Sequence, residues 1–476
     1  MLLIIMYMNG IQQSTASGYK YWSPAETMPH KEMKKLQLAR LREQVNYLWE
    51  KSPFYRQKWE QSNFCPALLR TLDDIRRIPI LHKEEIRLSQ EKEPPYGMMS
   101  IPGRGPFIRI GMTSGTTGEP VIIPFNEEDY FGVYCAGAAR AVWAAGIRKE
   151  DVVHAAFGFT PFLGLAAAYD CCEHLIGSLV IPGGIWNSLM RLTMIKKLGI
   201  TVLMGTPTYL LHLAKVAEEN GVDARTLGIR TILTAGEPGK MSIPNTGIRL
   251  EEAWGAKIFD YCGTQETHYL AWLCDENVGH MNEDLAYCEV LNPETDEPVP
   301  PGESGKLVVT DLVSKTHPCI RYETGDLVRG IEAGATCACG RTLSVLKGFM
   351  GRVGDVIKIR GVCVSVAGIE NVIRGIPECS DSYEYIASKT ENGMDKITVR
   401  VEPKSDLDPG LWDNMRKKVA QKLQLSFMIN MDVELLPPGT LPVFELKAKR
   451  FRDNRPSIAG VSNVSRQSAK KLTAKV

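Results

Sequence analysis

The stretch Gly111–Pro120 reads GMTSGTTGEP, with three glycines and four hydroxyl residues in ten positions. It lies between two strand-like runs, Phe107–Ile110 and Val121–Ile123. Glycine permits left-handed backbone angles that turn successive N–H groups toward one concavity, and Ser and Thr hydroxyls add further donors. The stretch therefore predicts a phosphate-binding loop, although a plain hairpin turn has a similar composition. It is not a Walker loop, because Gly-Lys followed by Ser or Thr is missing.

The composition is that of an ordinary globular protein. The chain of 476 residues is 44% hydrophobic and 23% charged, with a net charge of +1, and is long enough for two or three domains. This balance gives no electrostatic reason to expect a nucleic acid or an anionic membrane as partner. Met1–Met8 is apolar but lacks a basic start and a cleavage site, so we expect no signal peptide. Twelve cysteines without such a signal indicate reduced thiols or a metal site, and we expect a cytoplasmic protein.

Short apolar runs alternate with helical stretches through the middle of the chain, and this pattern predicts an α/β fold. The predicted strands are Asp151–Phe157, Ile200–Met204, Ile229–Leu233 and Ala256–Tyr261. Such alternation is typical of a mostly parallel sheet covered by helices on both faces. Lys306–Val313 alternates apolar and polar residues, which predicts a half-exposed strand.

The pattern changes after Gly351, where we predict a small α+β domain of about 100 residues. Its predicted strands include Val356–Ile359 and Lys396–Glu402, and its predicted helices are Val366–Arg374 and Leu411–Leu425. We therefore expect an N-terminal domain over residues 1–351, a C-terminal domain over 352–454 and a basic flexible tail over 455–476.

Four further motifs follow the glycine loop in order. They are Tyr261-Cys-Gly-Thr-Gln-Glu-Thr267, Tyr322-Glu-Thr-Gly-Asp326, Gly351-Arg352, and Lys447 within Phe444–Arg450. Each alone is more often structural than functional, since Thr-Gly-Asp is a common turn and Lys-Ala-Lys-Arg is usually a solvated basic face. In this order and spacing, however, the chain resembles the adenylate-forming superfamily, and within it the phenylacetate–CoA ligase branch.

The resemblance implies a large N-terminal domain that holds ATP and an acid, with a mobile C-terminal domain. It also implies a two-step reaction, in which an acid attacks the α-phosphate of ATP to give an acyl-adenylate and pyrophosphate, and coenzyme A then displaces AMP. Thr264 would donate to the α-phosphate, Glu266 would hold Mg²⁺, and Lys447 would bridge the attacking carboxylate and the α-phosphate. Asp326 would bind the ribose hydroxyls, and Arg352 would contact the ribose or a phosphate.

The resemblance assigns the remaining nucleotide contacts to the glycine loop, to an adenine-side segment and to the residues before Thr264. They are Thr113, Ser114, Gly115, Thr116, Thr117, Gly118, Ala235, Gly236, Glu237, Pro238, Tyr261, Cys262 and Gly263. Two positions depart from the common pattern. Val121 stands where many members have Lys, which leaves the pyrophosphate with one cation fewer, and Gly354 stands at a hinge position that is often Asp.

A second group of residues has the ligand types of a zinc site. It comprises Cys274, His280, Cys337 and Cys339, the last two within Cys-Ala-Cys-Gly. Three thiolates and one imidazole fill a tetrahedral zinc shell, so the ion would be structural. The alternative is four unrelated buried residues.

The substrate acid is indicated by an aromatic segment. Phe157, Phe159 and Phe162 lie where the branch lines its carboxylate pocket and could stack on an aryl ring, although they could equally be core residues. We expect a small aromatic acid, ATP and coenzyme A as ligands, and a possible homodimer. Two alternatives remain open: an adenylating synthetase with a different acceptor, as in the deazaflavin coenzyme type, and a non-catalytic nucleotide-binding protein of the same fold.

Overall fold

The computed structural model divides the chain into two compact units, Met1–Val353 and Gly354–Val476. It describes residues 20–113, 119–159, 161, 163–333, 336–352, 356–359, 362–390, 395–442 and 450–455. The division lies two residues beyond the domain boundary predicted from the sequence. Apart from Arg455, the predicted tail lies outside the described residues.

The first part of unit 1 is helical. Its elements are η1 (Pro24–Thr27), α2 (His30–Lys51), α3 (Pro53–Gln61), η2 (Pro66–Leu68), η3 (Leu72–Arg77) and α4 (Lys83–Lys92). Ser23 forms a capping box with Glu26 at the start of η1, and Ser52 caps α3 ahead of Pro53. The predicted strands on either side of the glycine loop are confirmed as β1 (Arg109–Met112) and β2 (Ile122–Phe125), which pair antiparallel.

A nine-stranded sheet forms the centre of unit 1. Its order is β13-β14-β9-β8-β7-β6-β5-β3-β4, and the strands from β7 to β4 run parallel. Its strands are β3 (Val152–Ala155), β4 (Leu179–Pro182), β5 (Val202–Gly205), β6 (Thr231–Thr234), β7 (Lys257–Thr264), β8 (His268–Leu273), β9 (Gly279–Met281), β13 (Ile331–Glu332) and β14 (Val345–Leu346).

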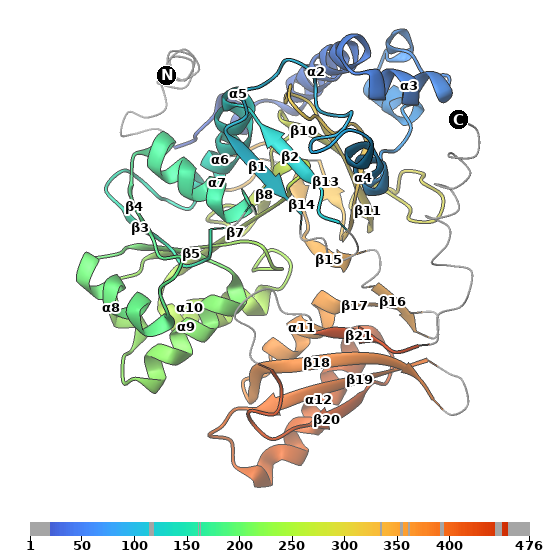
Figure 1. Ribbon diagram of the computed structural model, residues 1–476. Helices are drawn as coiled ribbons and strands as arrows, with labels where there is room; N and C mark the ends of the chain where they lie inside the picture. The colour runs from blue at the N-terminus through green and yellow to red at the C-terminus, as the bar shows by residue number, and fades with distance from the viewer. Residues whose placement is uncertain are drawn as a thin grey trace. The chain divides into compact units, whose positions relative to one another are not determined.

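Helices cover both faces of this sheet, as predicted (Figure 1). On β5, Val202 and Met204 face a core with α6 and α7, whereas Leu203 faces a core with α8, α9 and α10. The alternation follows from the period of two in a strand. The intervening helices are α5 (Glu127–Asp129), η4 (Tyr130–Cys135), α6 (Ala136–Ala144), α7 (Leu163–Cys171), η5 (Cys172–Ile176), α8 (Ser188–Leu198), α9 (Pro207–Glu219), η6 (Ala224–Thr226) and α10 (Pro244–Trp254).

A smaller antiparallel sheet completes unit 1. It contains β10 (Ala286–Leu291), β11 (Gly305–Asp311), β12 (Tyr322–Val328) and β15 (Phe349–Arg352). The prediction of a half-exposed strand near β11 is wrong, because all seven residues of β11 are buried. Its polar side chains have partners: Lys306 Nζ lies 3.2 Å from Glu323 Oε2, and Thr310 Oγ1 accepts the N–H of Arg321.

Unit 2 is a four-stranded sheet of order β20-β19-β18-β21 with two helices and a hairpin. Its elements are β16 (Val356–Ile359), β17 (Val362–Ser365), α11 (Val366–Arg374), β18 (Cys379–Lys389), β19 (Asp395–Pro403), η7 (Pro409–Leu411), α12 (Trp412–Phe427), β20 (Asp432–Leu435) and β21 (Phe451–Asp453). The helices pack on the sheet through one apolar core, so the predicted α+β arrangement is confirmed.

Candidate active site

The ends of the glycine loop are fixed at the hairpin. Thr113 donates its N–H to the carbonyl of Val121 at 3.1 Å, and Thr113 Oγ1 accepts the N–H of Val121 at 3.0 Å. Gly111 lies so close to Gln265 that an added Cβ would be 2.7 Å from Gln265 Oε1. The loop therefore starts beside the turn that follows β7. Residues 114–118 lie outside the described residues, so their phosphate contacts stay predictions.

Glu266 is a buried carboxylate with two donors. Its Oε1 accepts a hydrogen bond from the Tyr322 hydroxyl at 2.8 Å and lies 3.1 Å from Lys83 Nζ. Burial alone would raise the pKa of Glu266, but the Lys83 ammonium and the Tyr322 hydroxyl outweigh it and lower the pKa below the usual value. Glu266 is therefore ionised at neutral pH, as a ligand for a divalent cation must be. The side chain of Thr264 bonds within the turn that follows β7, because its Oγ1 accepts the N–H of Thr267.

Lys83 is a site residue that the sequence did not reveal. It is the first residue of α4, inside the capping box of His82 and Glu85, and the motifs recognised in the sequence do not include it. The same helix supports the far side of the glycine loop, because Arg87 Nε donates to the carbonyl of Glu119 at 2.8 Å and Gln90 exchanges two hydrogen bonds with Ile122. The sequence holds one indirect signal, which is Val121 in place of Lys. The pyrophosphate then lacks the cation that many members have at this position, and another residue has to supply it.

Asp326 and Arg352 face each other on neighbouring strands. They are register partners between β12 and β15, and Arg352 Nη1 lies 2.7 Å from Asp326 Oδ1. Burial raises the pKa of Asp326, while the Arg352 guanidinium opposes this shift. The two predicted ribose residues thus lie together, with the guanidinium about half exposed.

The adenine-side segment lies at the carboxyl edge of the parallel strands. Ala235 directly follows β6, and Gly236 has a φ of +84°, which favours glycine. Glu237 Oε2 accepts the N–H of Thr208 in the first turn of α9 at 3.1 Å. Pro238 continues this loop. The segment is therefore held against the end of β5.

Tyr261, Cys262 and Gly263 make structural contacts on β7. The Tyr261 hydroxyl donates to the carbonyl of Gly164 at 2.9 Å, and Cys262 Sγ contacts the carbonyl of Ala271 at 3.5 Å. Burial raises the pKa of the Cys262 thiol well above its usual range, so this thiol stays protonated. An added Cβ on Gly263 would be 2.1 Å from the carbonyl oxygen of His268, so the bulge there requires glycine.

Phe157 and Phe159 form an aromatic wall beyond β3. Their ring centroids lie 5.1 Å apart, and Tyr169 packs edge-on against Phe159 at 5.1 Å. Phe159 is 45% exposed, so it is not a core residue, whereas Phe157 packs partly against the core. Tyr169 is a member of this wall that the sequence did not reveal. Phe162 lies outside the described residues.

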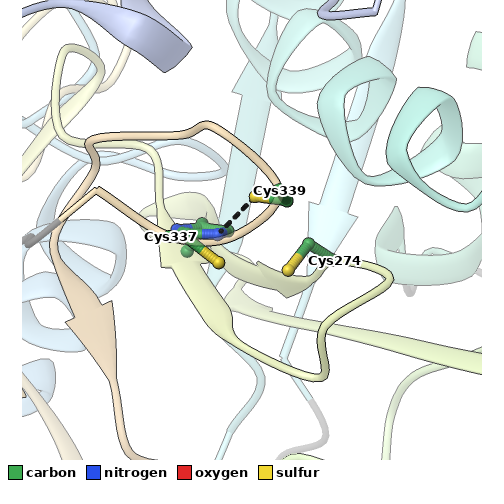
Figure 2. A group of neighbouring side chains, drawn as sticks. Cys274, Cys337 and Cys339 are labelled. Carbon is green, nitrogen blue, oxygen red and sulfur yellow. Dashed lines mark hydrogen bonds between the residues drawn. The ribbon is translucent and has the colours of Figure 1, made fainter.

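The four predicted zinc ligands come together. The ligand atoms of Cys274, His280, Cys337 and Cys339 all lie within 4.8 Å of one another, and Cys339 Sγ is 3.3 Å from His280 Nε2. Figure 2 shows the three thiols around one point, with Cys274 at the end of β8 and the other two on the loop before β14. This donor set and spacing fit a tetrahedral zinc ion, which would supply a structural cross-link.

Lys447, the residue predicted to bridge the acid and the α-phosphate, lies outside the described residues.

Among the described helices, none is both long enough and apolar enough to cross a membrane.

Comparison with known proteins adds two family matches. Residues 81–311 match the model of the AMP-binding enzyme family, and residues 361–455 match the AMP-binding enzyme C-terminal domain.

The relatives are of similar length. The chain is 30% identical over 455 residues to a phenylacetate-coenzyme A ligase of Thermus thermophilus, covering 91% of this chain and 99% of the relative. It is 28% identical to 2-hydroxyisobutyryl-CoA ligase in complex with 2-HIB-AMP, with a TM-score of 0.85 and 96% of both chains covered. A structure of that ligase with 2-HIB-AMP and CoA gives a TM-score of 0.68 at 29% identity, again over 96% of both chains.

Proposed function

Because the chain belongs to the family of phenylacetate–coenzyme A ligases, we propose that it joins an aromatic carboxylic acid to coenzyme A through an acyl-adenylate. In the first step the carboxylate oxygen attacks the α-phosphorus of ATP, and pyrophosphate leaves. In the second step the thiol sulfur attacks the acyl carbon and AMP leaves, while the thiol proton passes to solvent. The pairing of Lys83 with the ionised Glu266 beside the base of the glycine loop carries this proposal.

Glu266 and Lys83 have complementary roles in the first step. Glu266 would hold Mg²⁺, which would screen charge on the triphosphate. With Mg²⁺ on Glu266, the Lys83 ammonium would supply positive charge beside the base of the glycine loop, in place of the lysine that many members have at the position of Val121. A charge aimed at the departing pyrophosphate stabilises the transition state more than the substrate, because negative charge moves onto the leaving group.

Asp326 and Arg352 are proposed to bind the ribose. Among the described residues, the cation contact of Asp326 is made through Oδ1, so Oδ2 can accept a hydroxyl hydrogen bond while Arg352 keeps Oδ1. Thr264 is proposed to donate to the α-phosphate and Lys447 to bridge it to the acid. The segment Ala235–Pro238 is proposed to contact the adenine.

The substrate is proposed to be aromatic because Phe157, Phe159 and Tyr169 form a group of contacting rings in which Phe159 is 45% exposed. Aromatic pairs contribute about 0.5–1.5 kcal/mol of binding free energy beyond that of the area that they bury.

The four-ligand cluster is proposed to hold one structural zinc ion. The homodimer and the cytoplasmic location expected from the sequence stay predictions.

A pyrophosphate-release screen tests this function. The protein is incubated with ATP, Mg²⁺ and a panel of aromatic, aliphatic and hydroxy acids, with and without coenzyme A. Release that depends on an aromatic acid supports the proposal, and acceleration by coenzyme A supports the acceptor. Release unaffected by coenzyme A favours a different acceptor, and no release with any acid favours the non-catalytic alternative.

A further inference from the structure

His317 is a buried histidine beside the candidate active site. It lies in the loop between β11 and β12 and is 4% exposed. On one side of it, the N–H of Thr316 donates to Asp129 Oδ2 at 2.6 Å. On the other side, the Tyr55 hydroxyl donates to the carbonyl of Pro318 at 2.8 Å. The backbone is therefore held at both neighbours of His317, which fixes the point from which the ring extends.

The polar atoms of the His317 ring are not paired with protein groups. Neither ring nitrogen has a hydrogen-bond partner among the residues that the structure describes. Burial lowers the pKa of His317 to about 4, although the charges of Glu266 and Asp311 oppose the shift, so the ring is neutral with one donor and one acceptor. A buried polar group without a hydrogen bond is unfavourable, and ordered water commonly supplies the partner that the protein does not.

His317 and Glu266 line the same small cavity, which has a volume of about 10 Å³. This is the space that one water molecule occupies. Part of the lining is apolar and comes from β2. The other polar groups that line the cavity are Asp129, Gln265, His268, Asp311 and Ser314. A water molecule here would thus meet the two to four polar partners that a buried water needs.

The three carboxylates at this cavity differ in how they are paired. Asp129 and Asp311 accept backbone N–H groups of the loop that carries His317, so they hold the loop in place. Glu266 is contacted by Lys83 and Tyr322, and both contacts are made through Oε1. A carboxylate has about four lone-pair sites. Glu266 can therefore accept a further hydrogen bond from a water in the cavity and still bind a cation.

We propose that His317 is a positioning residue for Glu266, which it orients through one buried water molecule bonded to both side chains. This inference rests on the proposed function, in which Glu266 holds Mg²⁺. The water would donate one hydrogen bond to the Glu266 carboxylate and form another with a ring nitrogen of His317. Groups that orient a metal ligand in this way change metal binding or activity by about 10- to 100-fold when they are replaced.

The test measures the Kd of ATP by calorimetry in the presence and absence of Mg²⁺, without an acid, so that no reaction occurs. His317→Phe should weaken ATP binding roughly tenfold with Mg²⁺ and change it less than about threefold without Mg²⁺. His317→Gln retains a donor and an acceptor and should stay within about threefold of the wild type in both conditions. His174→Phe, an exposed substitution on η5, is the control and should match the wild type. Equal weakening of His317→Phe in both conditions, or no weakening in either, would overturn the inference.

A crystal structure of the wild type gives a second test, which stands if His317→Phe does not fold. An ordered water within hydrogen-bond distance of both His317 and Glu266 would support the proposal, and a cavity without one would overturn it. The calorimetry also separates this inference from the proposed function. Mg²⁺-dependent weakening in His317→Phe, together with no pyrophosphate release from any acid, would contradict the ligase assignment and support the role of His317. Pyrophosphate release with equal ATP binding by His317→Phe and the wild type would do the reverse.

Discussion

Lys83 Nζ lies 3.1 Å from Glu266 Oε1, although the two residues come from a helix ahead of the glycine loop and from the turn after β7. The same carboxylate oxygen accepts the Tyr322 hydroxyl at 2.8 Å. One ion pair therefore connects the helix that supports the loop with the residue assigned to the cation. It also keeps the buried Glu266 ionised before a nucleotide arrives.

Replacing Lys83 by Ala should slow the adenylation step by on the order of 10²–10³, the usual cost of one electrostatic contact to the transition state. Pyrophosphate release measures this step. Lys92→Ala, an exposed substitution at the other end of α4, serves as the control and should retain wild-type rates. Equal rates for Lys83→Ala and Lys92→Ala would show that Lys83 has no part in the first step.

Lys447→Ala should abolish adenylation and leave thioester formation from preformed acyl-AMP largely intact. The reason is that a cation between the acid and the α-phosphate stabilises charge only in the first transition state. Each half-reaction can be measured by mass spectrometry. Lys449→Ala is the control, and an equal loss of both half-reactions in Lys447→Ala would contradict the assigned role.

Asp260 makes the stability of the protein depend on pH. Burial raises its pKa to about 7, although the N–H of Met241 and the Lys240 ammonium oppose the shift. Because the folded-state pKa lies above the unfolded-state value, this contribution to stability is complete below about pH 4 and is lost as the pH rises through about 7. The Tm should therefore fall between pH 5 and pH 8, and the fall should be smaller in Asp260→Asn. An unchanged pH dependence in that variant would assign the effect to other groups.

The protein purified without chelators should contain about one zinc ion per chain. Cys339→Ser should lose the metal and lower the Tm, because a structural ion stabilises only the folded state. Cys65 lies outside the cluster, so Cys65→Ser should retain the metal. Metal analysis and calorimetry measure both effects, and a metal-free wild type of unchanged stability would rule out this site.

Phe159→Ala should raise KM for the aromatic acid by several-fold to tenfold and change KM for ATP little. The ring is 45% exposed and contacts both Phe157 and Tyr169, so its loss removes stacking surface without opening the core. Initial rates at varied acid and ATP concentrations separate the two constants. Equal changes in both constants would show that Phe159 acts on the fold rather than on the acid.

The sequence predicted the parts of the site that lie within continuous motifs. The β1–β2 hairpin follows from the local sequence. The recognised motifs also contain Asp326, Arg352 and the four predicted zinc ligands, and the structure brings each of these two groups together. Lys83 could not be found in this way, because its significance depends on its contact with Glu266, which is far away in the chain. The burial of β11 was also missed, because alternating polarity along the sequence does not show that Lys306 forms an ion pair with Glu323.

The most direct test of the central claim is the product balance with an aromatic acid, ATP, Mg²⁺ and coenzyme A, measured by mass spectrometry. The account predicts acyl-CoA, AMP and pyrophosphate in equal amounts, with acyl-adenylate as the species that accumulates when coenzyme A is left out. Formation of ADP and phosphate, or acyl-adenylate that coenzyme A does not convert into a thioester, would contradict it.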